Sequence, residues 1–323
     1  RTLQSIYNHA GKSVEIIVIN DCSDDEFDYA AAVRPYRATY IVNKKRKGVA
    51  ACRDMGVSLC KTPHFLLLDA HMRFYDQNWH TQIINILEKN DRQILCSQTR
   101  ILYKDENGII TEKSNISFGA YLPFYKQDYL LNVAWNHEEF DKKDLQQPIP
   151  LILGAGYAAS KRYWLYLKGL NGLYCYGNDE AYISLKVWLE GGQCVILKDV
   201  IIGHLYRDIA PYKVYNEQVI YNQLFIADTL LSSSMRFWTY ATACSMNKNI
   251  FFKAYKLLIA NKEKNEILKE YYKSIFVNKF ESLLPLHRFC MQKDMKRLHS
   301  RISLLPKIWD WIQQQSVQDF GVI

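Results

Sequence analysis

A short segment at the end of an apolar run has the residue types needed to bind a divalent cation. Asp69 and His71 are separated by one residue and follow the run Phe-Leu-Leu-Leu at 65–68. In an extended backbone, side chains at positions i and i+2 point to the same side, so both can reach one ion. A carboxylate with an imidazole suits Mn²⁺ or a similar divalent cation. Such a pair also arises by chance, in which case Asp69 caps a helix and His71 faces solvent.

A second imidazole far along the chain strengthens the metal hypothesis. His204 follows another apolar run, and Arg207 comes three residues later. A guanidinium at this distance suits the oxygens of a diphosphate held by a cation, because its fork of donors matches planar oxyanions. Asp69, His71 and His204 are therefore the predicted metal ligands, with Arg207 expected on phosphate oxygens.

Two adjacent carboxylates form a candidate pair for proton transfer. Asp179 and Glu180 follow a turn at Gly177 and precede a stretch with helical spacing that runs to residue 190. One interpretation assigns them to general acid or base catalysis. The other is that they only begin a helix, whose positive end favours acidic side chains. The turn before them favours the catalytic interpretation.

The elements that must position these residues alternate between strands and helices. The apolar runs at 14–20 and 65–68 end in carboxylates, and the segment around 48–60 between them has helical spacing. In open α/β sheets, ligands bind at the carboxyl ends of the strands. The predicted fold class is therefore α/β. Further strands are expected at 94–96, 109–111, 151–153 and 194–197, and further helices at 80–90, 161–168 and 179–190.

The start of the chain does not fit a complete doubly wound sheet. The first strand of such a sheet lies in its middle, but residues 1–13 indicate a helix and a turn. A central first strand is therefore expected to be missing from this chain. Either it lies upstream of residue 1, or the sheet is built differently.

The chain beyond residue 213 changes to successive helical stretches, including 248–261, 264–280 and 293–315. From Lys248 onward there are fourteen Lys and Arg against seven Asp and Glu, so this part holds +7 of the formal +8. We expect an α/β domain at 1–213 and a helical, basic region at 214–323. The default interpretation is a packed helical lid; the alternative is a surface that rests on an anionic membrane or polymer.

Composition excludes several classes of protein. Of its 323 residues, 49% are hydrophobic and 14% are aromatic, which is typical of an ordered globular protein. Its eight cysteines lack a CxxC pair, which argues against a zinc ribbon or a disulfide scaffold. The sequence lacks an apolar run long enough to span a membrane. A nucleic-acid partner is not expected, because no recognition motif accompanies the basic charge.

The motifs around Asp21, Asp69, Asp179 and His204, taken in their order and spacing along the chain, resemble those of the polypeptide N-acetylgalactosaminyltransferases. More broadly, they resemble those of GT-A glycosyltransferases of the family 2 type. The strand ending in Asp21 is similar to one that ends in Asp-Asp-x-Ser, with Asn20 in place of the first Asp. The other segments that carry the resemblance are 46–53, 65–71, 152–157, 176–184 and 203–212. The resemblance implies a Rossmann-like domain that binds a nucleotide sugar over residues 1–213.

The resemblance also implies roles for particular residues. Asp21 would contact the uracil or ribose, and Arg46 and Arg53 the nucleotide side of the donor. Asp69, His71 and His204 would hold Mn²⁺, and Arg207 would bind the diphosphate. The remaining substrate-binding residues by this resemblance are Gly156 in the glycine loop, Tyr176 in place of a Trp, and Tyr212 in a loop that closes over the donor.

The expected activity is metal-dependent transfer of a sugar, N-acetylgalactosamine or a close relative, from a UDP donor to a hydroxyl of a protein or glycan. Asp179 and Glu180 differ from the Glu-Asn of the family. They fit either retention or the inverting chemistry of family 2 enzymes that build polysaccharide or wall polymers. The alternative of another class is a non-catalytic nucleotide-binding scaffold. The expected location is the cytoplasm, with peripheral membrane contact, or the Golgi lumen if the protein is eukaryotic.

Overall fold

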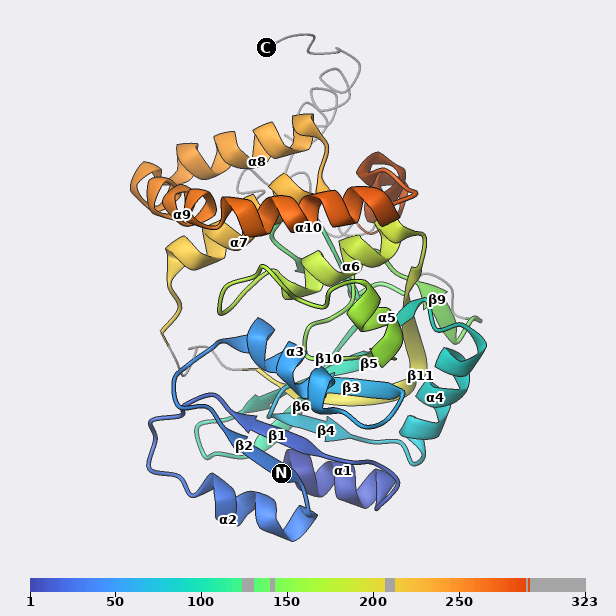
Figure 1. Ribbon diagram of the computed structural model, residues 1–323. Helices are drawn as coiled ribbons and strands as arrows, with labels where there is room; N and C mark the ends of the chain where they lie inside the picture. The colour runs from blue at the N-terminus through green and yellow to red at the C-terminus, as the bar shows by residue number, and fades with distance from the viewer. Residues whose placement is uncertain (124–130, 140–142, 207–212, 289, 291–323) are drawn as a thin grey trace.

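The computed structural model describes residues 1–123, 131–139, 143–206, 213–288 and 290 (Figure 1). At its centre is a mixed seven-stranded sheet with the order β3-β10-β5-β11-β4, in which β6 pairs with β5 and β9 with β11. These strands are β3 (His64–Leu68), β4 (Met72–Phe74), β5 (Gln93–Lys104), β6 (Ile110–Ser117), β9 (Gln146–Pro148), β10 (Gly156–Ser160) and β11 (Gln193–Leu205). A small antiparallel pair consists of β7 (Ala120–Tyr121) and β8 (Ala134–Trp135).

Helices cover both faces of this sheet. The α-helices are α1 (Thr2–Ala10), α2 (Tyr29–Val33), α3 (Val49–Leu59), α4 (Trp79–Lys89), α5 (Lys161–Tyr166), α6 (Asp179–Glu190), α7 (Asn216–Leu230), α8 (Ser233–Met246), α9 (Lys248–Ala260) and α10 (Lys262–Ile275). Two 3-10 helices, η1 (Arg34–Tyr36) and η2 (Phe280–Leu283), complete the described elements. In Figure 1, α7 to α10 lie above the sheet and α1 lies below it.

Strand β5 shows why both faces need a cover. Ile94 and Cys96 belong to an apolar cluster shared with α6 and α7, whereas Leu95 belongs to a second cluster shared with α1 and α4. Successive side chains of a strand point to opposite faces of the sheet. A strand that is apolar on both sides therefore needs helices on both sides, which confirms the predicted α/β class.

Strand β1 (Ile17–Asn20) belongs to a two-stranded sheet that is separate from the seven-stranded one. It pairs in parallel with β2 (Thr39–Val42), and this pair carries Asp21 and Asn43 just beyond its carboxyl ends. The side chains of β1 are only half-buried. That a central first strand is missing from this chain stays a prediction.

The helices beyond residue 213 share a core with the sheet. Phe225 of α7 and Tyr272 of α10 lie in the same cluster as Tyr157 of β10. The Tyr272 hydroxyl lies 2.8 Å from that of Tyr182 in α6, and the Val277 amide donates to the Leu189 carbonyl at 2.9 Å. The boundary near residue 213 stays a prediction, but the helices on its far side are packed against the helix that begins at Asp179.

Most predicted elements are present, with two differences. The strand predicted at 151–153 is wrong: Leu151 makes only an isolated bridge to Ala120. Strands β2, β4, β7, β8, β9 and β10 and the short helix α2 were not predicted. Helices α9 and α10 confirm the predictions for 248–261 and 264–280, while the helix predicted at 293–315 lies outside the described residues. Within the described part of the chain, no helix is both long and apolar enough to cross a bilayer.

Candidate active site

The sheet topology brings the three predicted metal ligands together. Strand β3 ends at Leu68, directly before Asp69, and β11 runs antiparallel to β4 with His204 opposite Met72. This register places His204 beside His71, and the Leu205 amide donates to the His71 carbonyl at 3.1 Å. One ligand atom from each of the three residues lies within 4.8 Å of the others. The predicted triad is thus assembled from two distant parts of the sequence.

The donor set fits a divalent cation. The Nε2 atoms of His71 and His204 face each other at 2.9 Å, and His204 Nε2 lies 3.5 Å from Asp69 Oδ2. Two imidazole nitrogens at this separation can both coordinate one ion. Carboxylate oxygen with imidazole nitrogen accommodates Mn²⁺ and related divalent ions.

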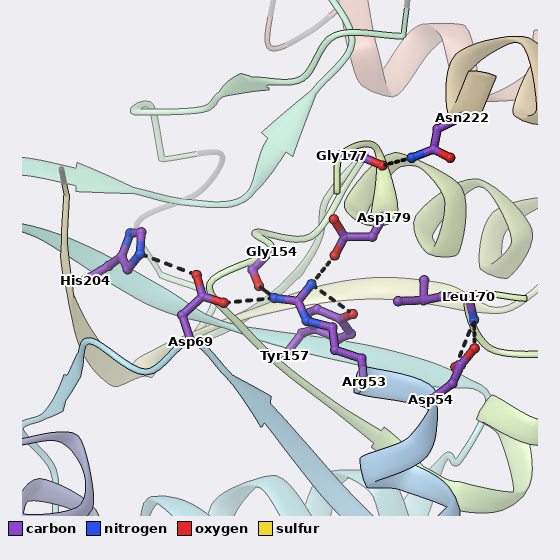
Figure 2. Close-up of polar contacts among 10 residues, drawn as sticks. All are labelled: Arg53, Asp54, Asp69, Gly154, Tyr157, Leu170, Gly177, Asp179, His204 and Asn222. Atoms are coloured by element: carbon purple, nitrogen blue, oxygen red, sulfur yellow. Dashed lines mark hydrogen bonds and ion pairs between the residues drawn. The ribbon is translucent and has the colours of Figure 1, made fainter. Parts of the chain in front are cut away.

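Arg53, from α3, connects Asp69 of the triad to the carboxylate of Asp179 in α6 (Figure 2). Its guanidinium donates to Asp69 Oδ1 at 3.0 Å, to the Gly154 carbonyl at 2.7 Å, and to Asp179 in a short contact. Burial alone would raise the pKa of Asp69, but the His204 imidazole and the Arg53 guanidinium outweigh it and hold that pKa below its usual range. Asp69 therefore stays ionised and ready to ligate a cation.

The two carboxylates at the start of α6 have different surroundings. Asp179 is 7% exposed and its carboxylate is held by Arg53. The Glu180 carboxyl lies against Gly154, where an added Cβ would come within 2.7 Å of Glu180 Oε1. Burial of this carboxyl, together with the charge of Asp179, raises the pKa of Glu180 to about 8. A buried carboxyl whose pKa is raised toward neutral is typical of an acid or base in an active site.

Asp21 organises the loop that follows β2. Its carboxylate accepts hydrogen bonds from the Lys47 amide at 2.9 Å, the Gly48 amide at 2.7 Å and the Asn43 side chain at 2.8 Å. Burial would raise the pKa of Asp21, but these donors outweigh it and lower that pKa. Asp21 thus fixes the segment that carries Arg46, whose half-exposed side chain contacts the Cys22 carbonyl at 3.4 Å.

The same loop approaches the turn before Asp179. Gly48 has φ 90°, and a Cβ there would come within 2.1 Å of the Cys175 Cα. The Val49 amide donates to the Cys175 carbonyl at 2.7 Å. A glycine is therefore required where the predicted nucleotide segment meets the turn.

The other predicted substrate-binding residues fall into three places. Tyr176 is 46% exposed in the turn before α6. Gly156 lies inside the sheet, opposite Leu68, and its missing side chain leaves room for Ile202 and Leu68. Arg207 and Tyr212 lie outside the described residues.

Sequence reasoning missed three residues that build the site. Gly154 supplies a carbonyl to Arg53 and space for Glu180, and Tyr157 places its ring under the Arg53 guanidinium, 5.3 Å from the Cζ atom. Asn222, from α7, binds the turn before Asp179. The paired glycines at 154 and 156 were a usable signal for Gly154, whereas a lone Asn in a helix gives none.

Comparisons with known proteins agree with this geometry. The model of the family described as glycosyl transferase family 2 matches residues 1–158. Residues 1–158, just under half of the 323, are thus similar to the family 2 glycosyltransferases. The crystal structure of GalNAc-T7 with UDP, GalNAc and Mn²⁺ matches with a TM-score of 0.63 at 17% identity, covering 82% of this chain and 52% of that one. This match confirms the predicted GT-A fold.

The curated relatives confirm the predicted resemblance to polypeptide N-acetylgalactosaminyltransferases. Polypeptide N-acetylgalactosaminyltransferase 10 of Homo sapiens is 27% identical over 227 residues, which cover 66% of this chain. The chain spans only 36% of that relative's length. The inactive polypeptide N-acetylgalactosaminyltransferase-like protein 5 of Mus musculus is 23% identical over 238 residues, covering 69% of the chain and 53% of the relative. Similarity to both a transferase and a protein named as inactive does not by itself assign an activity, which depends on the residues of the site.

Proposed function

We propose that this glycosyltransferase moves a sugar, N-acetylgalactosamine or a similar N-acetylhexosamine, from a UDP donor to a hydroxyl of a protein or glycan acceptor, with Mn²⁺ or another divalent cation. The observation that supports it most is the triad Asp69, His71 and His204, brought together from two strand ends of a GT-A fold. The bound cation would offset the negative charge that the leaving UDP gains.

The triad and the residues around it would bind the cation and the nucleotide-sugar donor. Asp69, His71 and His204 would hold the cation, while Asp21 keeps the loop of Arg46 in place for the nucleotide. Arg207, Tyr176, Tyr212 and Gly156 remain predicted contacts of the donor. Arg53 is engaged by protein groups on several sides, so its predicted contact with the donor would be made while it still holds Asp69 and Asp179.

Glu180 has the environment that favours a base for the acceptor hydroxyl. A base works best when its pKa lies near the working pH, because it must be free of a proton and still attract one. The raised pKa of Glu180, about 8, meets this condition, whereas Asp179 is committed to Arg53. Asp179 would then set the charge beside Glu180 and the position of Arg53.

A protein base also supports the second candidate, an inverting family 2 transferase that acts on a polysaccharide or wall polymer. In that reaction the base deprotonates the acceptor as it attacks the face of the sugar opposite UDP. The anomeric configuration of the product, measured by NMR, separates the two. Inversion would favour the second candidate, and retention would favour the N-acetylgalactosaminyltransferase-like reaction.

Release of UDP tests whether the protein is an enzyme or a nucleotide-binding scaffold. We expect UDP to appear when the protein is incubated with UDP-sugars and Mn²⁺, fastest with UDP-N-acetylhexosamines, and to stop when a chelator removes the cation. UDP binding without release, with every UDP-sugar and with acceptors of both classes, would instead support the scaffold.

We also propose that the basic C-terminal helices associate with an anionic membrane or polymer. Residues 233–260, in α8 and α9, contain four Lys or Arg and no Asp or Glu. Phe237 and Phe252 on these helices are 67% and 54% exposed. Basic residues interleaved with exposed aromatic side chains are typical of protein surfaces that lie on anionic lipid.

Salt should weaken this association steeply, because exposed charges are screened within about 8 Å at physiological ionic strength. We expect co-sedimentation with vesicles that contain anionic phospholipid to fall as salt rises, and to fall at low salt in the double variant Lys253→Glu and Lys256→Glu. The variant Lys12→Glu with Lys61→Glu changes the net charge equally on exposed residues elsewhere and should bind like wild type. Vesicle binding that is independent of salt, or equal in both variants, would contradict the proposal.

A further inference from the structure

The turn that leads into Asp179 is held from outside by one side chain of the C-terminal helices. Asn222 of α7 is fully buried and faces this turn (Figure 2). Its Oδ1 atom accepts from the Tyr174 amide at 2.7 Å. Its Nδ2 atom lies within hydrogen-bond distance of the carbonyls of Tyr174 at 2.9 Å, Tyr176 at 3.2 Å and Gly177 at 2.9 Å. The amide group of one side chain thus contacts three residues of the turn, Tyr174, Tyr176 and Gly177.

The turn has a backbone conformation that needs such support. Cys175, Gly177 and Asn178 have φ values of 33°, 100° and 64°. Positive φ is costly for residues other than glycine and persists where the surrounding structure imposes it. Asn222 binds the turn on one side, and the Val49 amide binds the Cys175 carbonyl on the other. The turn is therefore fixed between α7 and the loop that Asp21 organises.

The end of this turn sets where α6 begins. Asn178 is the N-cap residue, Asp179 is the first helical residue, and the Asp179 carboxylate meets Arg53. Arg53 also binds Asp69 of the metal triad. A shift of the turn would move Asp179 relative to Arg53 and thus relative to Asp69, and misplacement of reacting groups by about 1 Å is enough to slow an enzyme strongly.

We infer that Asn222 is a positioning residue. By holding the 174–177 turn, it keeps Asp179 and Glu180 in place relative to the metal triad. This role rests on the proposed function, because it requires the carboxylates of α6 to take part in the reaction. It also gives the helices beyond residue 213 a part in catalysis, although the matched family model ends at residue 158.

The variant Asn222→Ala in the full chain tests this role. We expect the turnover number with UDP-sugar, acceptor and Mn²⁺ to fall about tenfold or more, while the affinity for Mn²⁺ stays near that of wild type. Amide hydrogen exchange at Tyr174, whose N–H loses its acceptor, should become faster. Asn222→Asp should slow turnover as well, because it keeps the acceptor for Tyr174 but sets a carboxylate against three carbonyl oxygens. If Asn222→Ala does not fold, Asn222→Ser carries the same expectations.

Thr229→Val is the matched control on the same helix. The Thr229 hydroxyl is buried and donates within α7 to the Phe225 carbonyl at 2.7 Å, so its loss removes a hydrogen bond without touching the turn. We expect this variant to lose thermal stability but to keep its turnover number. Equal turnover in the Asn222 variants and in Thr229→Val would overturn the inference, and so would unchanged exchange at Tyr174.

Asp179→Asn separates this inference from the proposed function. Full turnover in Asp179→Asn would refute the part given to Asp179, whereas a wild-type protein that releases no UDP would refute the proposed function. Loss of turnover in Asp179→Asn together with wild-type turnover in Asn222→Ala would overturn only the role of Asn222.

Discussion

Replacement of His204 by Ala should lower the affinity for Mn²⁺ and the turnover of UDP-sugar by more than about 100-fold, since loss of a residue that only supports a ligand already costs roughly 10- to 100-fold. The variant removes one of three side chains whose ligand atoms lie together at the ends of β3 and β11. Titration of the protein with Mn²⁺ gives the affinity, and release of UDP gives the turnover. His71→Ala should behave in the same way.

His64→Ala provides the control, because His64 lies at the opposite end of β3 from Asp69. It should bind Mn²⁺ and turn over like wild type. Chelator-treated wild-type protein that keeps full activity would remove the metal site from the reaction, whatever the variants do.

Replacement of Glu180 by Gln should lower turnover by roughly 10²- to 10⁴-fold, the range expected for a general base. In the wild type, turnover should rise about tenfold per pH unit below about pH 8, because the base must lose its proton and the pKa of Glu180 is raised to about 8. Glu180→Gln should lose this dependence. The affinity for UDP should change little, so a loss confined to the Michaelis constant would make Glu180 a binding residue.

Asp179→Asn distinguishes the roles of the two carboxylates. It removes a negative charge that helps to raise the pKa of Glu180, so the rise of turnover should move to lower pH. Turnover itself should also fall, because Arg53 loses a charged partner. If the pH dependence instead disappears in Asp179→Asn and persists in Glu180→Gln, then Asp179 is the base.

The Glu180 carboxyl also makes folding stability depend on pH. The pKa of Glu180 rises from an ordinary value of 4.5 to about 8 in the folded protein, so the folded state binds the extra proton. Its stabilising effect is fully present below about pH 4.5 and is lost as the pH rises to about 8. Thermal unfolding of Glu180→Gln across this range should show a flatter decline than the wild type.

The metal triad was predictable because its chemistry is local in sequence. Asp69 and His71 both follow a run of apolar residues, and strand alternation alone places their side chains on one side. His204 was predicted from its place after another apolar run, with Arg207 three residues later, and the resemblance supported it. The antiparallel register that sets it beside His71 joins residues 133 positions apart, and one sequence does not reveal such pairings.

Strand β10 and Asn222 show why other parts were not predictable. The sequence of β10, Gly-Tyr-Ala-Ala-Ser, has little β-propensity, and it forms a strand because β3 and β5 on either side supply partners. The small side chains fit where both faces are covered. Asn222 is an ordinary helical residue in sequence, and its role exists only because α7 packs against the turn.

The core that the sheet shares with α7 and α10 has a consequence for hybrid proteins. An exchange of everything after residue 213 between two glycosyltransferases would cut through the contacts of Phe225, Tyr272 and Asn222. The transplanted helices would have to match the recipient's α6 side chain for side chain, because tightly packed interiors tolerate few changes in volume. The helices beyond residue 213 are therefore not a detachable module, and evolution or engineering must alter them by substitutions within the fold.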